Sequence, residues 1–386
     1  MVARRCRLWL ACFGLTVLIA APGCLDRDSA ATANVAPQPK GQSPDDLKKK
    51  IDGIVDYTLN ARLMNVRDHA AWQVVHGIEA YGRDLPIEHD GQVSSALDYL
   101  LAGGVLKGWS LRPGDKGVIS IIEAGSKTGQ GHPDQWLGYM SQSGDVKPDD
   151  VLIVGTKQYH IRDLLTEAQW DIYDGLEASW TLMGAVAFLP LDAHWTAKDG
   201  SKWTVDRLVA MEAAQPLGTG GCYGTHRLYA LAIAVNKYVK ETGIGPKNLK
   251  GGWRAAYERV SEGLDKVHEF QRPDGAFSTG FFEKSIESAD LGGRLYAAGH
   301  TLEFVTVAIG SHLYFDRDVP ESSAAESRPY DLSDEWVVAG VNRLCDQLNA
   351  ARDMDPDCGT LYHAAHSLRL YRDLRFGQRR PHLAAN

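Results

Sequence analysis

One short pattern recurs along the 386 residues: an aromatic residue, two or three further residues, then histidine, any residue and an aliphatic residue. The histidines of its four copies are His76, His226, His300 and His366. In "EASWTL" Trp180 takes the histidine position of a fifth copy, and "GHPDQWLGYM", with His132, is a looser sixth. The copies lie 44 to 74 residues apart. One helical hairpin with a variable loop has this length, so the pattern predicts six helical hairpins.

Helical spacing of apolar residues supports this prediction, as in Leu47, Ile51 and Ile54 after the expected cap Ser43. An amphipathic segment precedes each copy, at about 46–64, 92–102, 161–170, 204–214, 250–270 and 333–351. Stretches such as "LYALAIAV" can pack on all sides, whereas "WRAAYERVSEGLDKVHEF" has one polar face. The first kind would line the inside of a ring and the second its outside.

The predicted fold class is therefore all-α, an (α/α)6 toroid over residues 45–375. Small β-hairpins are expected between helices near "GVISII", "VLIVGTKQYHI" and "HWTAKDGSKWT". A looser α-solenoid and a two-domain helical protein are the alternatives.

The amino-terminal segment has the pattern of a targeting signal. Three arginines, the apolar run "LWLACFGLTVLIAA" and then Pro22-Gly23-Cys24 resemble a bacterial lipoprotein signal, although Ala21 stands where leucine is commoner. The resemblance implies a signal peptide over 1–23, lipidation of Cys24 and export to a periplasmic or other extracytoplasmic membrane face. Residues 24–44, rich in Pro and Ala, would be a flexible linker, and 376–386 a carboxy-terminal tail. Ordinary cleavage and an uncleaved anchor are the alternatives.

The charge balance argues against a nucleic-acid partner. The formal net charge is -8. Removing the signal, which carries three arginines and no acids, makes the remainder three charges more negative. An acidic chain repels the phosphate backbone.

Three cysteines remain after the signal and the lipid-attachment position are set aside: Cys222, Cys345 and Cys358. Cys345 and Cys358 lie at facing ends of two helical patterns. In an oxidising compartment they are expected to form a disulfide, which leaves Cys222 unpaired.

The stretch "HEFQRPDGAFSTGFF" resembles the repeat of the terpenoid cyclase and protein prenyltransferase superfamily, in which a Q-x-x-D-G-x-F/W turn joins an outer helix to an inner one. Gln271 would cap neighbouring helix ends, Asp274 and Gly275 would form the turn, and Phe277 would pack between repeats. The motif covers about forty residues in one clean copy. "DPDCGT" is faintly similar to the acidic motif of triterpene cyclases, with Asp357 as the acid.

"GGCYGTH" and "AAGHTLEF" resemble the zinc-ligand helices of protein prenyltransferases. The resemblance implies that Cys222 and His300 are ligands. The family's aspartate falls at Gly220, which has no ligand atom. His226 lies one helical turn from Cys222 and can supply the missing donor, so zinc bound by Cys222, His226 and His300 is the predicted cofactor. The alternative is that Cys222 is only a buried thiol.

The histidines of the pattern would form a ring around one cavity, and buried imidazoles require polar partners. Glu79 and Glu303 each follow a histidine by three residues, which places carboxylate and imidazole on one helical face. The two glutamates could orient the rings or act as general acid and base, so Glu79, Glu303, His76 and His366 are the candidate catalytic groups. The expected partner is a small-molecule or polar ligand in the cavity.

Three functions stay open. The first is a prenyltransferase-like or cyclase-like toroid lipoprotein. The second is a sugar-handling enzyme, because "GHTLEF" resembles the His-x-x-Glu helix of the N-acylglucosamine epimerase group and the aromatic side chains Trp72, Trp136, Trp180 and Tyr296 could stack on a sugar. The third is a non-catalytic binding or scaffold lipoprotein.

Overall fold

The computed structural model describes residues 42–122, 131–310 and 330–377. In this part of the chain 57% of residues are helical and 12% are in strands, which confirms a mainly helical fold. The predicted signal peptide, the lipid-attachment position Cys24, most of the linker and nearly all of the tail lie outside the described residues.

Six helices correspond to the segments around the recurring pattern, and each packs against the next. They are α2 (Ala71–Tyr81), α4 (Gln135–Gln142), α6 (Ser179–Phe188), α8 (Thr225–Thr242), α10 (Leu291–Gly310) and α13 (Cys358–Phe376). Contacts run from α2 through α4, α6, α8 and α10 to α13, and α13 packs back on α2.

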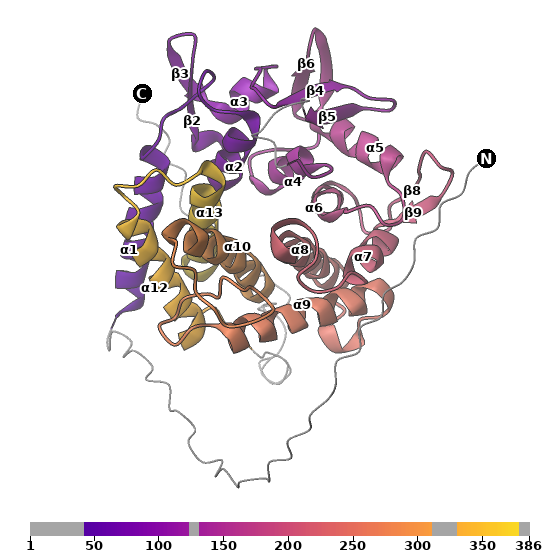
Figure 1. The fold of residues 1–386 in the computed structure, drawn as a ribbon. Coiled ribbons are helices and arrows are strands. Elements are labelled where there is room, and N and C mark those ends of the chain that lie inside the picture. Colours follow the sequence, from indigo (N-terminus) through magenta and orange to yellow (C-terminus); the bar gives the residue numbers. More distant parts are fainter. Residues whose placement is uncertain (1–41, 123–130, 311–329, 378–386) are drawn as a thin grey trace, which may run out of the picture. The chain divides into compact units, whose positions relative to one another are not determined.

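The remaining six helices of the described part lie outside this set in Figure 1, mostly at the predicted amphipathic segments. They are α1 (Pro44–Asn60), α3 (Ala96–Leu101), α5 (Ile161–Asp171), α7 (Val205–Ala213), α9 (Gly251–Phe270) and α12 (Glu335–Ala350). Short 3-10 helices are η1 (Gly82–Asp84), η2 (Gly221–Gly224) and η3 (Pro246–Asn248).

Burial distinguishes the two sets of helices as their composition predicts. On α6 every residue from Ser179 to Val186 is buried, whereas the buried residues of α9 follow one stripe that includes Trp253, Val260 and Val267. A helix that is apolar all round needs neighbours on every side, and a one-sided helix needs only one.

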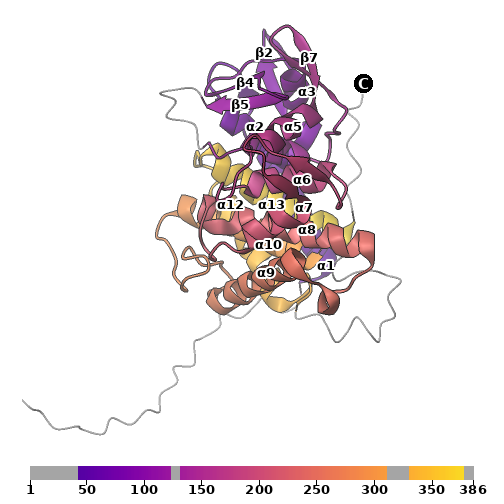
Figure 2. The same cartoon turned by 90° about the vertical axis from the view of Figure 1, so that its right-hand side faces the viewer.

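Nine short strands lie between helices in the described part of the chain, and Figures 1 and 2 place β2, β4 and β5 at the same edge of the helical body. The predicted hairpins form as β4 (Trp109–Pro113) with β5 (Val118–Ile122), β6 (Val151–Val154) with β7 (Lys157–His160), and β8 (His194–Thr196) with β9 (Lys202–Thr204). All three pairs are antiparallel.

A three-stranded sheet was not predicted from the sequence. It contains β1 (Met64–Asn65), parallel to β2 (Pro86–His89), and β3 (Gln92–Ser95), antiparallel to β2. The helix predicted over 92–102 therefore begins only at Ala96. Asp90 and Gly91, with φ of 49° and 74°, form the turn between β2 and β3. Asp-Gly is a strong hairpin signal because both positions need positive φ.

The turn after α9 has the contacts that its sequence predicts. Gln271 Nε2 donates to the carbonyl oxygens of Gly275 (2.9 Å) and Trp336 (2.8 Å), and so links the turn to the first residues of α12. Gly275 has φ of 85°, and Phe277 is buried against Gly340 of α12. Asp357, in contrast, caps α13 by accepting the Thr360 N–H at 3.0 Å, which is a structural role.

The expected disulfide between Cys345 and Cys358 does not form in the structure. Both thiols are free and fully buried. Cys345 lies within α12, while the Cys358 sulfur accepts a hydrogen bond from Arg62 at 2.8 Å. Cys358 is thus directed toward the residues after α1 and is already partnered there.

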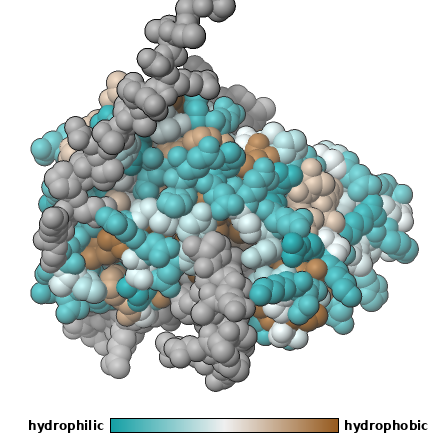
Figure 3. Space-filling model, turned by 90° about the horizontal axis from the view of Figure 1, so that it is seen from below, coloured by the Kyte–Doolittle hydropathy of each residue, from teal (hydrophilic) through white to brown (hydrophobic). Residues whose placement is uncertain are grey.

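Hydrophilic residues cover most of the coloured surface in Figure 3, and the apolar areas between them are small and separate. Among the described helices, none is both long and apolar enough to cross a bilayer.

Candidate metal centre

Polar side chains from α2, α4, α8, α10 and α13 meet in the interior where a core would ordinarily be apolar. Each is at most 5% exposed: His76, Glu79, Tyr139, His226, His300, Glu303, His363 and His366. Six of them are the histidines and glutamates named as candidates from the sequence. We call these eight residues the central polar cluster.

His363 lies at the middle of the imidazoles. Its ring centroid is 3.9 Å from that of His300, 4.9 Å from that of His76 and 5.1 Å from that of His226. Imidazoles from four helices are therefore in direct contact, although their residues are spread over most of the chain.

Cys222, His226 and His300 form the first group of potential ligands. One ligand atom of each lies within 4.8 Å of the others. The Nε2 atoms of His226 and His300 are buried and have no hydrogen-bond partner among the described residues, while His300 Nδ1 is 2.8 Å from the Tyr296 carbonyl oxygen. An unpartnered buried polar atom costs about 1–3 kcal/mol. A bound cation would remove that cost.

The backbone at Cys222 is strained. Cys222 and Tyr223 have φ of 51° and 57°, in the left-handed region that favours glycine. The segment is held on both sides, because Gly221 N–H donates to Glu177 at 2.6 Å and the Tyr223 ring stacks on Phe281 at 4.5 Å. Backbone strain of this kind clusters at functional sites.

Gly220, the position of the family's aspartate, could not hold a ligand in this arrangement without disturbing its surroundings. Its φ is 92°, and a Cβ there would lie 3.0 Å from the Arg227 guanidinium. A carboxylate at this position would therefore meet Arg227.

Glu303 and Glu79 form a second group with the histidines of α13. Glu303 Oε1 lies 2.9 Å from His363 Nδ1 and 2.8 Å from His366 Nδ1. Glu79 lies 3.7 Å from each of the same two nitrogens, and its Oε2 has no hydrogen-bond partner among the described residues. Each carboxylate thus faces the imidazoles of α13, and not the histidine on its own helix as expected.

Burial shapes the charge of the central polar cluster. It lowers the pKa of His76 to about 4 and the pKa values of His226, His300 and His363 well below their usual range. It raises the pKa values of Glu79 and Glu303, and the charge of Glu303 raises that of Glu79 further. Neutral imidazole is the form that binds metal ions, and a cation would favour ionised carboxylates beside it.

Cys222 is partly exposed, but its sulfur lies inside the protein, and burial raises the pKa of the thiol to about 12. A nearby metal ion is the usual means by which a buried thiol is deprotonated.

The sequence analysis missed two members of the central polar cluster. His363 stands three residues before His366 in "YHAAHSL", and this spacing was the available signal. The Tyr139 hydroxyl lies 3.1 Å from His76 Nε2 and 3.5 Å from His363 Nε2, in the place where the loose sixth copy was expected to supply a histidine. His132 instead contacts Glu177 at 3.0 Å and stacks on Trp180 at 4.4 Å.

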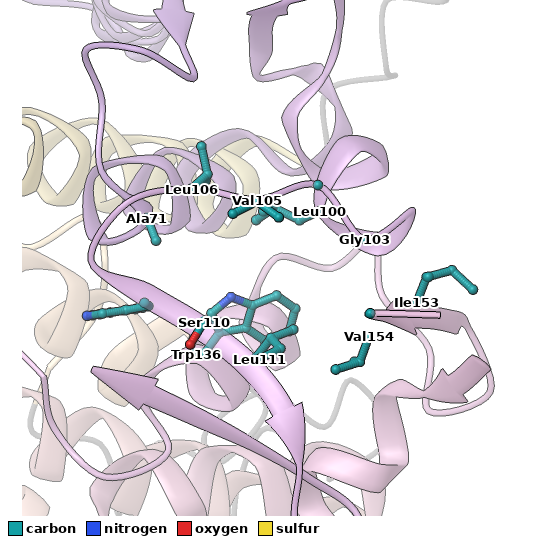
Figure 4. Close-up of a pocket in the computed structure, with 13 residues that line it drawn as sticks. Ala71, Leu100, Gly103, Val105, Leu106, Ser110, Leu111, Trp136, Ile153 and Val154 are labelled. Atoms are coloured by element: carbon teal, nitrogen blue, oxygen red, sulfur yellow. The ribbon is translucent and has the colours of Figure 1, made fainter. Parts of the chain in front are cut away.

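A cavity of about 330 Å³ leads to one side of the cluster. Glu79 and His366 line it, together with Gln142, Arg369 and Asp373. A smaller hollow of about 100 Å³, shown in Figure 4, lies beside β4 and β6 and contains no titratable side chain. The cavity beside Glu79 is therefore the better candidate for a substrate route.

No protein-family model matches the chain, and comparisons with curated proteins and with solved structures find no match. The function of the chain is therefore inferred from its own residues.

Proposed function

We propose that the chain is a metal-dependent enzyme on an α/α toroid, related in design to the prenyltransferase and terpenoid cyclase superfamily. Two observations support the toroid: the contacts among the six inner helices return from α13 to α2, and the Gln271 turn joins an outer helix to an inner one. Inner helices in such a ring present equivalent positions to one central cavity, as the recurring histidines require.

In this proposal Cys222, His226 and His300 hold a zinc ion. The two unpartnered Nε2 atoms are the observation that carries the assignment, since each is buried beside the Cys222 thiol. Zinc favours thiolate and imidazole, and catalytic zinc sites combine three protein ligands with one open position. The alternative of a plain buried thiol leaves both nitrogens without a partner.

Bound zinc would supply a Lewis acid that makes a coordinated water or thiol nucleophilic near neutral pH. With zinc alone bound, the candidate proton-transfer groups are Glu79 and His366, which line the cavity, and Glu303, which contacts His366. The cavity residues Gln142 and Arg369 favour a small polar substrate. Sugar stacking is less well supported, since Trp180 is fully buried.

The proposal predicts about one equivalent of zinc at the Cys222 site of the purified chain. Cys222→Ala and His300→Ala should each abolish it, because two remaining ligands do not hold zinc tightly. Elemental analysis after gel filtration measures the loss. Cys345→Ala is the matched control. It removes a different buried thiol, which lies on α12, and should leave the zinc content unchanged. Equal zinc in Cys222→Ala and the unmutated chain would contradict the assignment and favour a non-catalytic binding protein.

We also propose that the domain is exported and tethered to a membrane through Cys24, on the signal-like sequence before it. Cells grown with a labelled fatty acid should incorporate label into the unmutated chain and not into Cys24→Ser, because that thiol is the attachment point. Equal label in both chains would exclude lipidation at this residue.

A further inference from the structure

Four side chains meet beside the cavity: Glu79 of α2, Glu303 of α10, and His363 and His366 of α13. Their facing oxygen and nitrogen atoms are 2.8 to 3.7 Å apart across the four pairs of carboxylate and imidazole. Donor atoms around one metal ion are separated by roughly 3 Å, since each bond is about 2.0–2.2 Å long. Glu79, Glu303 and His363 thus have the spacing of a ligand set, with one ligand atom of each within 4.8 Å of the others. His366 Nδ1, 2.8 Å from Glu303, can supply a fourth ligand.

Hydrogen bonds satisfy only one of the two carboxylates of this group, that of Glu303. Glu303 accepts from both imidazoles of α13, which satisfies its carboxylate. Glu79 is equally buried, yet its Oε2 is without a partner among the described residues. Burying a carboxylate without a partner is costly, and coordination to a cation is one of the few ways to avoid that cost.

The sequence spacing also fits. His76 and Glu79, His300 and Glu303, and His363 and His366 are three such pairs, each separated by three residues on a different helix. In helical proteins with two-metal centres, facing helices supply ligands at this i, i+3 spacing.

We propose that Glu79, Glu303, His363 and His366 bind a second divalent metal ion, so that the chain binds two ions at adjacent sites. Imidazoles with carboxylates and no thiol suit Mn²⁺, Fe²⁺ or Zn²⁺. The second site uses none of the ligands of the first. The second site can exist without the proposed zinc site. Only the two-metal arrangement rests on the proposed zinc site as well.

The two sites are adjacent because α10 supplies ligands to both. His300 belongs to the first and Glu303, one helical turn further, to the second. The rings of His300 and His363, one from each site, are 3.9 Å apart. Paired metal ions stabilise both the attacking and the leaving oxygen of a displacement, so this arrangement favours hydrolysis of a small ester, amide or phosphate. The open cavity beside Glu79 and His366 gives such a substrate access.

The test counts zinc in the purified chain after removal of bound metal and reloading with Zn²⁺ alone. The unmutated chain should bind two equivalents. Glu303→Gln and Glu79→Gln, which keep side-chain size, should each retain one, and Cys222→Ala should retain the other. Cys222→Ala combined with Glu303→Gln should bind none, while Cys345→Ala should bind two.

The outcomes separate the two proposals. One equivalent in the unmutated chain, abolished by Cys222→Ala and kept by Glu303→Gln, would overturn the second site and leave the zinc site intact. One equivalent that is abolished by Glu303→Gln and kept by Cys222→Ala would overturn the zinc site at Cys222 and support the second site. Should the glutamine variants not fold, Cys222→Ala decides alone, because its retained equivalent supports the second site and its absence overturns it.

Discussion

Gly299→Ala should lower the free energy of unfolding by about 1–3 kcal/mol and reduce metal binding in the same variant. Gly299 lies where α10 crosses α13. A Cβ there would be 2.7 Å from the Ala364 nitrogen and 2.9 Å from the His363 carbonyl carbon. Both atoms belong to backbone, so the helices themselves would have to separate. Separation would move His300 and His363, whose rings now touch, away from each other.

Gly53→Ala is the matched control for this prediction. Gly53 is also within a helix, but a Cβ there meets nothing within 4 Å. Alanine has the higher helix propensity, so this variant should be as stable as the unmutated chain or more stable by up to about 1 kcal/mol. Urea unfolding followed by circular dichroism compares the two variants. Equal stability of both would mean that α10 and α13 do not pack as closely as described.

Glu212→Ala should cost about 3–5 kcal/mol of unfolding free energy, the largest effect that we expect of a single substitution. Glu212 is fully buried and lies 3.0 Å from Arg227 Nε, which is itself 6% exposed. Its carboxylate also accepts the Ala178 N–H at 3.0 Å and the Ser179 hydroxyl at 2.9 Å. Alanine would leave the buried Arg227 guanidinium without its carboxylate partner, although Thr219 still accepts from it, and would remove the acceptor for the first residues of α6.

Glu258→Ala separates this effect from the loss of an ordinary ion pair. Glu258 lies 2.7 Å from Arg254 on the exposed face of α9, where such a pair contributes less than about 1 kcal/mol. Chemical unfolding of both variants measures the difference. A Glu212→Ala chain as stable as Glu258→Ala would show that the buried pair contributes no more than a surface one.

Local patterns in the sequence were sufficient to predict the helices. Most of the predicted amphipathic segments begin within a few residues of a helix of the structure, and each copy of the recurring pattern lies within a helix or just before one, because amphipathic spacing and caps such as Ser43 act over a single turn. The early part of the 92–102 segment is strand β3 and not helix, because the Asp90-Gly91 turn directly before it forms a hairpin.

Partners across helices could not be predicted in the same way. The i, i+3 spacing places His300 and Glu303 one turn apart on α10, but it cannot show that α13 brings His363 and His366 to the Glu303 carboxylate. The predicted disulfide is absent from the structure for a related reason. Cys345 and Cys358 are close in sequence, but the group that contacts Cys358 is Arg62, which is far away in sequence.

The packing of α13 on α2 has a consequence for the order of events during synthesis. Glu79 is translated early, whereas His363 and His366 emerge only after nearly three hundred further residues. Ribosomes add about 5–20 residues per second, so many seconds pass between the synthesis of Glu79 and that of the two imidazoles that it faces. Until α13 leaves the ribosome, the nascent chain has only part of its ligand set. Any metal ion at the proposed second site would therefore bind late, after translation of the last helix.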